Sequence, residues 1–280
     1  MYRTLSLPDK FYFGIMNSTS IQETVPPSEI PSQAEALALQ KVKKPVQKTL
    51  ILGFLGGVYI SMGGLLAVII SSGFPEWTAY NPGLQKLLMG AMFPIGLILV
   101  VFSGAELFTS NNATFIPGVL NKRYGWGKVM KNWSFVWLSN FVGALFFAYV
   151  IVYLTKIIAS DPWQSGIIHI AEAKTSYPWH IVFLKGIAAN WLVCLAIWLG
   201  LASRTATGKM LGIWFPVMCF VAIGFEHSIA NMFFIPSGIF QGADISWVTF
   251  IWDNLIPATL GNIIGGALFV GAAHWYVNKV

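Results

Sequence analysis

The stretch GFEHSIANMFFIPSG, residues 224–238, places Glu226 beside His227 in an otherwise apolar run. An ionisable side chain within a bilayer costs free energy unless protein or water surrounds it, so such residues indicate pathways or buried networks. Proline and glycine near the end of the run are residues that interrupt helices. We therefore interpret this stretch as part of a broken membrane-spanning helix, and it raises the question of what the break is for.

The composition of the whole chain is that of an integral membrane protein. Of its 280 residues, 56% are hydrophobic and only 10% are charged, and the mean hydropathy is +0.66. A soluble domain carries about 25% charged residues. The net charge of +6 does not indicate a nucleic-acid partner, because the basic residues lie in short connections between apolar runs. Cys194 and Cys219 lie within apolar runs, and no metal site or cofactor is expected.

The apolar runs predict an all-α integral membrane fold with six spans. Each run is near the roughly 20 residues that cross the hydrocarbon core. We divide the chain into an N-terminal tail, residues 1–46, with a short surface helix over 31–45, and a transmembrane channel domain, residues 47–280. The six predicted spans cover about 49–73, 84–118, 133–155, 179–202, 210–240 and 247–277, with the second and fifth interrupted.

Basic residues predict the orientation in the membrane. Six spans place Arg3, Lys10, Lys41, Lys43, Lys44, Lys48, Lys122, Arg123, Lys128, Lys131, Arg204, Lys209 and Lys279 on one side. The other side keeps only Lys86, Lys156, Lys174 and Lys185. Connections rich in lysine and arginine remain in the cytoplasm. We therefore expect a multi-pass protein of the cell membrane with both termini cytoplasmic.

The two interrupted spans repeat each other about 120 residues apart. Residues 104–111, GAELFTSN, and 224–231, GFEHSIAN, share the pattern G-x-E-x-x-x-x-N. Phe-Pro precedes each copy and Phe-Ile-Pro follows it. Because three spans separate the copies, they run in opposite directions, which is the inverted 3+3 repeat of many channels and transporters. Irregular backbone in a bilayer must be buried in protein or line a cavity, so both breaks should face the centre.

Glu106 and Glu226 have a predicted structural role at the breaks. Each break leaves N–H groups unpaired at the start of the resumed half-helix, and a carboxylate there is placed to accept from them. We expect both glutamates, with Asn111 and Asn231 of the same motif, to stabilise the breaks. Direct proton transport by the glutamates is the alternative.

Three segments carry a resemblance to a known family. GAELFTS, GIAANWLVCLA (residues 186–196) and GFEHSIANMF (residues 224–233) resemble the formate–nitrite transporters, and the match extends over about residues 34–278. The resemblance implies an aquaporin-like six-span fold and a homo-pentamer with one pore in each protomer. It also implies conduction of small monovalent anions such as formate, nitrite, hydrosulfide or lactate across the lipid bilayer.

The resemblance also implies roles for individual residues. His227 matches the central pore histidine, and Thr109 and Asn190 match polar residues near it. Lys174 matches a lysine of the outer vestibule, and Lys185 is a second basic group there. The residues that match the apolar constrictions are Phe93, Leu97, Leu107, Phe108, Val193 and Phe220.

These residues suggest how an anion would pass. Lysines raise the local anion concentration, constrictions remove water, and His227, Thr109 and Asn190 offer hydrogen-bond donors. Proton transfer from an imidazolium to a monocarboxylate in water is uphill by roughly 3.4 kcal/mol. In a dry pore the neutral products gain, because desolvation penalises both charged reactants. We hypothesise that His227 binds the anion and can protonate it, so that the neutral acid crosses a constriction.

The motifs favour formate as the substrate, with nitrite or hydrosulfide as alternatives. A neutral-solute channel for water or glycerol shares the inverted-repeat plan but would be expected to carry paired Asn-Pro-Ala signatures. None is present, and the Asn-Pro-Gly at 81–83 lies in a loop. A membrane enzyme is disfavoured, because no metal-ligand cluster, nucleotide loop or nucleophile–base pair appears.

Overall fold

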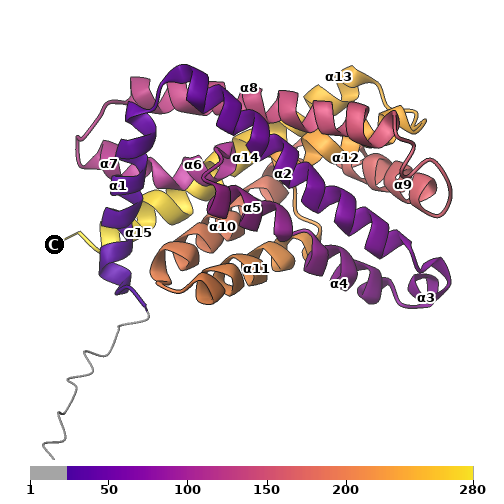
Figure 1. Ribbon diagram of the computed structural model, residues 1–280, viewed down its shortest axis with the longest axis horizontal. Helices are drawn as coiled ribbons and strands as arrows, with labels where there is room; N and C mark the ends of the chain where they lie inside the picture. Colours follow the sequence, from indigo (N-terminus) through magenta and orange to yellow (C-terminus); the bar gives the residue numbers. More distant parts are fainter. Residues whose placement is uncertain (1–23, 280) are drawn as a thin grey trace, which may run out of the picture.

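The computed structural model describes residues 24–279, and within them the chain is helical (Figure 1). The predicted tail is therefore described only in part, since residues 1–23, with Arg3 and Lys10, lie outside the described residues. A single bridge pairs Thr24 with Ser203, and Val25 donates its N–H to the carbonyl of Ala202 at 2.7 Å. This bridge ties the start of the described chain to the end of the fourth span.

The two halves of the chain contain similar series of helices. After a short 3-10 turn, Pro27–Glu29, the first half contains α1 (Ile30–Lys43), α2 (Val46–Ser72), α3 (Pro75–Tyr80), α4 (Pro82–Met92), α5 (Ile95–Ser103), α6 (Phe108–Thr114), α7 (Ile116–Leu120), α8 (Trp126–Phe146) and the π-helix η2 (Phe147–Tyr153). The second half contains α9 (Trp163–Thr175), α10 (Trp179–Ala202), α11 (Ala206–Ile223), α12 (Ser228–Phe240), α13 (Trp247–Thr249), η3 (Phe250–Leu255), α14 (Ile256–Gly266), η4 (Ala267–Ala272) and α15 (Ala273–Val277).

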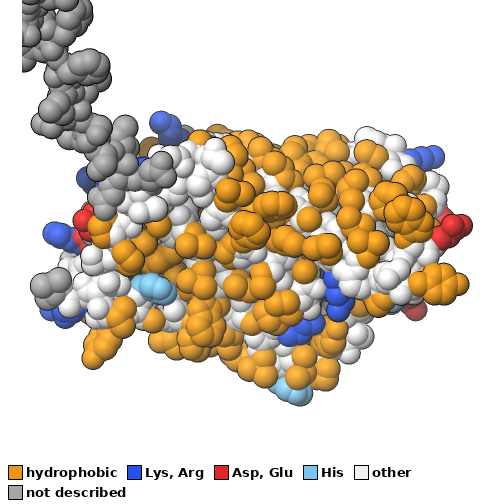
Figure 2. All heavy atoms as spheres, turned by 90° about the horizontal axis from the view of Figure 1, so that it is seen from below, with side chains coloured by type: hydrophobic (Ala, Val, Ile, Leu, Met, Phe, Trp, Pro, Cys, Tyr) orange, Lys and Arg blue, Asp and Glu red, His pale blue; other side chains and the backbone are white. Residues whose placement is uncertain are grey.

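Six helical segments are long and apolar enough to cross a bilayer, as predicted. They are Val46–Ser72, Pro82–Ser103, Trp126–Tyr153, Trp179–Ala202, Ala206–Ile223 and Trp247–Val277. Figure 2 shows hydrophobic side chains over most of the face seen from below, with acidic side chains only toward its two ends. The chain is thus a multi-pass membrane protein.

Both repeated motifs interrupt their helices at a glycine. Helix α5 ends at Ser103, followed by Gly104 with φ of 74°. Helix α11 ends at Ile223, followed by Gly224 with φ of 85°. These left-handed conformations favour glycine, because a Cβ clashes with the backbone there. The chain then runs extended for a few residues before α6 and α12 begin.

The resumed half-helices α6 and α12 lie on either side of the middle of the bundle (Figure 1) and are enclosed by other helices. All seven residues of α6 are buried, including Thr109 and Asn111. Eleven consecutive residues of α12, from Ser228 to Gly238, are buried as well. The irregular backbone between each pair of half-helices is thereby shielded from lipid, as membrane burial requires.

Glycine pairs allow the long helices to approach backbone to backbone. A Cβ added to Gly56 would overlap the carbonyl oxygen of Glu106, and one on Gly57 would overlap that of Asn140. The same holds at Gly261 and Gly265, which lie against the backbone of α10. Helix α2 therefore packs tightly on α8, and α14 on α10, which is the packing that small residues permit in membranes.

We expect Gly57→Ala to destabilise the protein by about 1–3 kcal/mol or more, because the added methyl has no space and the opposing atom is backbone. The effect is measured as the thermal midpoint in detergent, which is obtained from the loss of folded protein on size-exclusion chromatography. Gly127→Ala is the matched control, since a Cβ there meets nothing within 4 Å. Equal midpoints for the two variants would contradict the packing argument.

Candidate functional site

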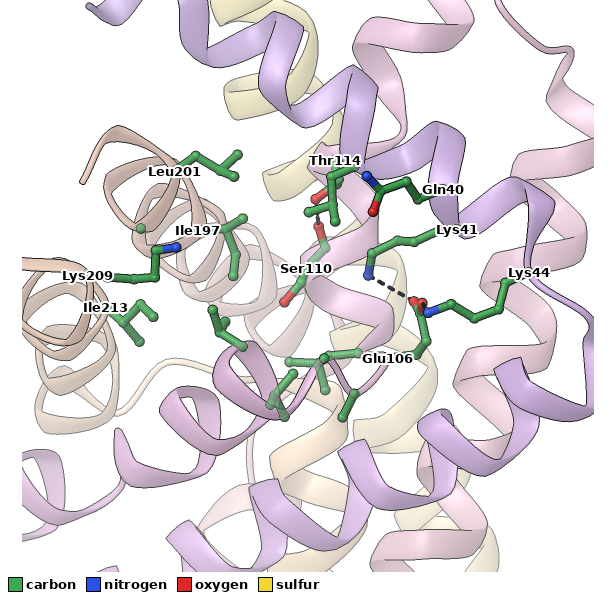
Figure 3. A pocket seen from close by; sticks show the side chains of 17 residues that line it. Gln40, Lys41, Lys44, Glu106, Ser110, Thr114, Ile197, Leu201, Lys209 and Ile213 are labelled. Carbon is green, nitrogen blue, oxygen red and sulfur yellow. Dashed lines mark hydrogen bonds and ion pairs between the residues drawn. The ribbon is translucent and has the colours of Figure 1, made fainter. Parts of the chain in front are cut away.

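Two cavities enter the bundle from opposite ends. The first, which we name the α1-side cavity, has a volume of about 250 Å³ and lies between α1, α6, α10 and α11 (Figure 3). Its polar lining includes Lys41, Lys44, Glu106, Ser110 and Lys209. The second, the α9-side cavity, has a volume of about 170 Å³. It is lined in part by Lys174, Lys185, Glu226, His227 and Phe234.

A small apolar space, the central cavity, lies between them. Its volume of about 10 Å³ is close to the minimum that holds one water molecule. It shares Leu107 with the α1-side cavity and His227 with the α9-side cavity. Its lining residues are Ile60, Phe93, Leu97, Leu107, Val193, Val217, Phe220 and His227.

Five of the six predicted constriction residues thus line the central cavity, namely Phe93, Leu97, Leu107, Val193 and Phe220. Phe108 does not line any of these three cavities. It packs edge-on against Trp133, with ring centroids 6.2 Å apart. The prediction for Phe108 therefore differs from the structure, because its side chain leaves α6 on the face toward α8.

His227 begins α12 and contacts Thr109 of α6. Its Nε2 lies 3.0 Å from Thr109 Oγ1, and its Nδ1 accepts the N–H of Ala230 at 3.1 Å. A backbone N–H can only donate, so Nδ1 carries no proton and the ring proton is on Nε2. The neutral ring therefore donates to Thr109, which leaves the threonine hydroxyl proton available to another acceptor.

This hydrogen bonding limits what His227 can do in the conformation seen. A neutral imidazole with its proton on Nε2 is a hydrogen-bond donor, whereas an acid needs both ring nitrogens protonated. Protonation at Nδ1 requires the ring to release the N–H of Ala230. The ring also stacks on Phe220, with centroids 5.6 Å apart. A proton could reach Nδ1 only if the ring moved away from its helix-capping position.

Asn190 does not line the cavities described above. Its side-chain N–H₂ donates to the carbonyl oxygens of Thr109 at 3.2 Å and Asn262 at 2.6 Å, and to Asn112 Oδ1 at 3.1 Å. The residue is fully buried. The structure therefore places Asn190 as a cross-link between α6, α10 and α14 rather than beside a passing anion, and its donors are already used.

Glu106 is the centre of a buried network beside the α1-side cavity. Its carboxylate accepts from Lys41 Nζ at 2.9 Å and Lys44 Nζ at 2.7 Å, as Figure 3 shows. Asn111 Nδ2 donates to the same carboxylate at 2.9 Å and to Asn132 Oδ1 at 2.8 Å. These contacts join α1 to the break after α5.

Glu226 repeats this arrangement beside the α9-side cavity. Its carboxylate accepts from Lys174 Nζ at 3.2 Å and pairs with Lys185 Nζ at 3.7 Å. Asn231 Nδ2 donates to it at 2.7 Å and Asn254 Nδ2 at 3.2 Å. The two predicted vestibule lysines are therefore ion-paired, so Glu226 offsets part of their positive charge.

The prediction that both glutamates accept from the half-helix N–H groups is wrong in its detail. The N–H of Phe108 donates to Asn140 Oδ1 at 3.0 Å, and that of Ser228 donates to Asn262 Oδ1 at 2.8 Å. The two asparagine amides also donate to the carbonyls of Glu106 and Glu226 at 2.9 Å. A neutral amide satisfies both the donors and the acceptors of a break, whereas a carboxylate only accepts.

The sequence carries a signal for these asparagines. Asn132 and Asn140 lie eight residues apart in the third span, and Asn254 and Asn262 show the same spacing in the sixth. Paired polar residues within apolar runs that repeat between the halves indicate a repeated buried network. Lys41 and Lys44, by contrast, show only the positive charge of a cytoplasmic tail in the sequence, and nothing there indicates their contact with Glu106.

Further contacts attach α1 to the rest of the protein. Glu35 accepts from Asn121 Nδ2 at 2.6 Å and Arg123 Nε at 2.7 Å. Burial, with the negative charge of Glu35 nearby, raises the pKa of the Tyr124 phenol. The phenol therefore stays neutral and donates to the carbonyl of Phe115 at 2.9 Å. Helix α1 is thus packed on the ends of the bundle, and its Ala34 and Ala38 are fully buried.

A six-span inverted repeat with two cavities and an apolar centre is the architecture of a membrane channel or transporter. The model of the formate/nitrite transporter family matches residues 28–276. The chain belongs to this family, a family of transporters, which confirms the resemblance seen in the three sequence segments.

Named relatives agree with this assignment. The chain is 46% identical over 264 residues to the probable formate transporter of Methanothermobacter thermautotrophicus, covering 89% of this chain and 96% of that protein. It is 36% identical over 272 residues to the formate channel FocA of Escherichia coli (strain K12), covering 90% and 93%. A solved structure described as a pentameric formate channel with formate bound matches with a TM-score of 0.74 and 33% identity, covering 84% of this chain and 98% of that one.

Proposed function

We propose that this protein conducts small monovalent anions, formate first, through the α1-side, central and α9-side cavities of each protomer of a homo-pentamer. The observation that carries the proposal is the pairing of two basic cavities across an apolar centre that holds one titratable ring. Formate and the pentamer are proposed because relatives are named as formate transporters or channels and a similar structure is a formate-bound pentamer. We assign it no enzymatic reaction and no cofactor.

The charges of the two cavities favour anions. In the α1-side cavity Lys41, Lys44 and Lys209 face the single carboxylate of Glu106. In the α9-side cavity Lys174 and Lys185 face that of Glu226. Each cavity keeps an excess of positive charge, and a basic recess with low-dielectric walls raises the local concentration of anions.

At the centre, the apolar lining and the His227–Thr109 pair have complementary effects. A space with the volume of about one water molecule excludes the hydration shell of an anion. Thr109 is fully buried and lines none of the three cavities, so its hydroxyl, whose oxygen accepts from His227 Nε2, can donate to a carboxylate oxygen only after the His227 ring moves aside. We propose that the anion crosses as its neutral acid, after the His227 ring leaves the N–H of Ala230 and exchanges a proton. Asn190 then acts by holding Thr109 in place.

The orientation of the chain is part of the proposal. Helix α1 and the C-terminal end of the chain lie at the same end of the bundle (Figure 1). Basic connections are retained in the cytoplasm, so we propose that this end faces the cytoplasm of a cell membrane. On this view residues 1–46 form the cytoplasmic tail and residues 47–280 the channel domain.

Anion flux into proteoliposomes tests the proposed function. We expect the purified protein to raise initial formate uptake well above that of protein-free vesicles, with nitrite and hydrosulfide measured side by side. Protein-free vesicles are the necessary control, because formic acid itself crosses lipid. A protein that speeds osmotic shrinkage with water or glycerol, yet leaves formate uptake at the level of empty vesicles, would refute an anion channel.

A further inference from the structure

The α1-side and α9-side cavities are related residue by residue through the repeat. An offset of 120 positions carries Gly104 to Gly224 and Glu106 to Glu226, and each member of a pair lines its own cavity. The fold therefore supplies two versions of one cavity in the same molecule. Differences between equivalent positions show what is specific to each side.

At three pairs of equivalent positions, the α1-side residue is polar or charged and the α9-side residue is apolar. The α1-side cavity has Ser110, Thr114 and Lys209, whereas the α9-side cavity has Ala230, Phe234 and Met89 at the corresponding positions. Polar or charged groups on the first side thus replace apolar groups on the second. These differences lie at positions that the repeat makes equivalent, since α6 and α12 correspond, as do α11 and α4.

The hydroxyl of Ser110 has no hydrogen-bond partner among the described residues, although its residue is only 6% exposed. In Figure 3 the Ser110 side chain projects into the cavity, facing the helix that carries Lys209. A buried hydroxyl without a partner costs free energy unless water or a ligand satisfies it. This position therefore suits a ligand with an acceptor atom.

Lys209 supplies a positive charge from the opposite wall. Lys41 and Lys44 share the carboxylate of Glu106, while no ion pair of Lys209 occurs within residues 24–279. Three ammonium groups thus face one carboxylate in this cavity, against two and one in the α9-side cavity. An acceptor between the Ser110 hydroxyl and the Lys209 ammonium is favoured most when it is anionic.

We infer that the α1-side cavity contains an anion-binding site made by Ser110 and Lys209 that has no counterpart in the α9-side cavity. The inference rests on the proposed function and adds an asymmetry to it. A small carboxylate is bound before it reaches the central cavity from this side only. The half-saturating formate concentration is therefore lower at the α1 face than at the α9 face. In a passive pathway, the ratio of maximal flux to half-saturating concentration must be the same from both faces. The maximal flux from the α1 face is therefore lower as well.

The test measures initial ¹³C-formate flux against concentration at equal pH and zero voltage, from each face of membrane vesicles of known orientation. We expect Ser110→Ala and Lys209→Gln each to raise the half-saturating concentration at the α1 face about threefold to tenfold, the range of one lost hydrogen bond or charge contact. The value at the α9 face should stay unchanged. Lys209→Arg keeps the charge and should stay within about twofold of the unmodified protein.

Arg204→Gln is the matched control, because Arg204 is an exposed cation just before α11 that lines neither cavity. It should alter neither face. Vesicles with the unmodified protein that pass no formate would refute the proposed function itself. Normal formate flux with unchanged half-saturation in both Ser110→Ala and Lys209→Gln would refute only the site, as would an equal effect of Arg204→Gln.

Discussion

Replacing His227 by asparagine is expected to give a channel that folds normally and whose formate flux no longer follows pH. Asparagine is a favoured N-cap residue, so its Oδ1 can accept the N–H of Ala230 as Nδ1 of His227 now does. The variant therefore keeps the start of α12 but has no titratable ring. In the unmodified protein, flux should rise as pH falls, because the His227 ring is protonated more often and can pass a proton to the anion.

His227→Phe separates the two contributions of the ring. Phenylalanine removes both the proton and the cap, so its thermal midpoint should fall by the equivalent of about 1 kcal/mol, whereas that of His227→Asn should not. Formate uptake between pH 5 and 8, after subtraction of the flux into protein-free vesicles, gives the pH profile. A His227→Asn profile as steep as that of the unmodified protein would show that the ring does not exchange the transported proton.

The sequence predicted the broken spans because their signal is local. Glycine at 104 and 224, followed by an acid and later by Phe-Ile-Pro, repeats in the same order, and each feature acts on its own stretch of backbone. The six spans follow from apolar length alone. The family resemblance, which carries information that periodicity lacks, predicted five residues that line the central cavity and the proximity of Thr109 to His227.

What the sequence did not predict depends on contacts between distant spans. Asn140 and Asn262 cap half-helices that begin more than 30 positions away, so no local pattern joins each cap to its helix. Lys41 reaches Glu106 because α1 folds back against the bundle, a placement that amphipathic character alone does not fix. Asn190 was expected beside the anion, but the direction of a buried amide follows from its neighbours on α6 and α14.

Glu226→Gln is expected to destabilise the protein strongly. The Glu226 side chain is 1% exposed and holds Lys174 and Lys185, whose side chains are 14% and 20% exposed. Breaking a buried ion pair by removing one partner costs about 3–5 kcal/mol, because the remaining charge stays buried. The glutamine oxygen can keep the bonds from Asn231 and Asn254, which both donate to Oε2, but its N–H₂ would then face the Lys185 ammonium, which is itself a donor.

Glu172→Gln is the matched control, since Glu172 is exposed on the same helix as Lys174 and its substitution should cost less than about 0.5 kcal/mol. The thermal midpoints of the two variants are compared in detergent. Glu106→Gln should lower the midpoint about as much as Glu226→Gln, because Lys41 and Lys44 then lose their ion-pair partner Glu106. If Glu226→Gln has the same thermal midpoint as Glu172→Gln, the carboxylate is not needed to hold the break. The asparagine cap from α14 would then suffice, and Glu226 would serve the anion route instead of the fold.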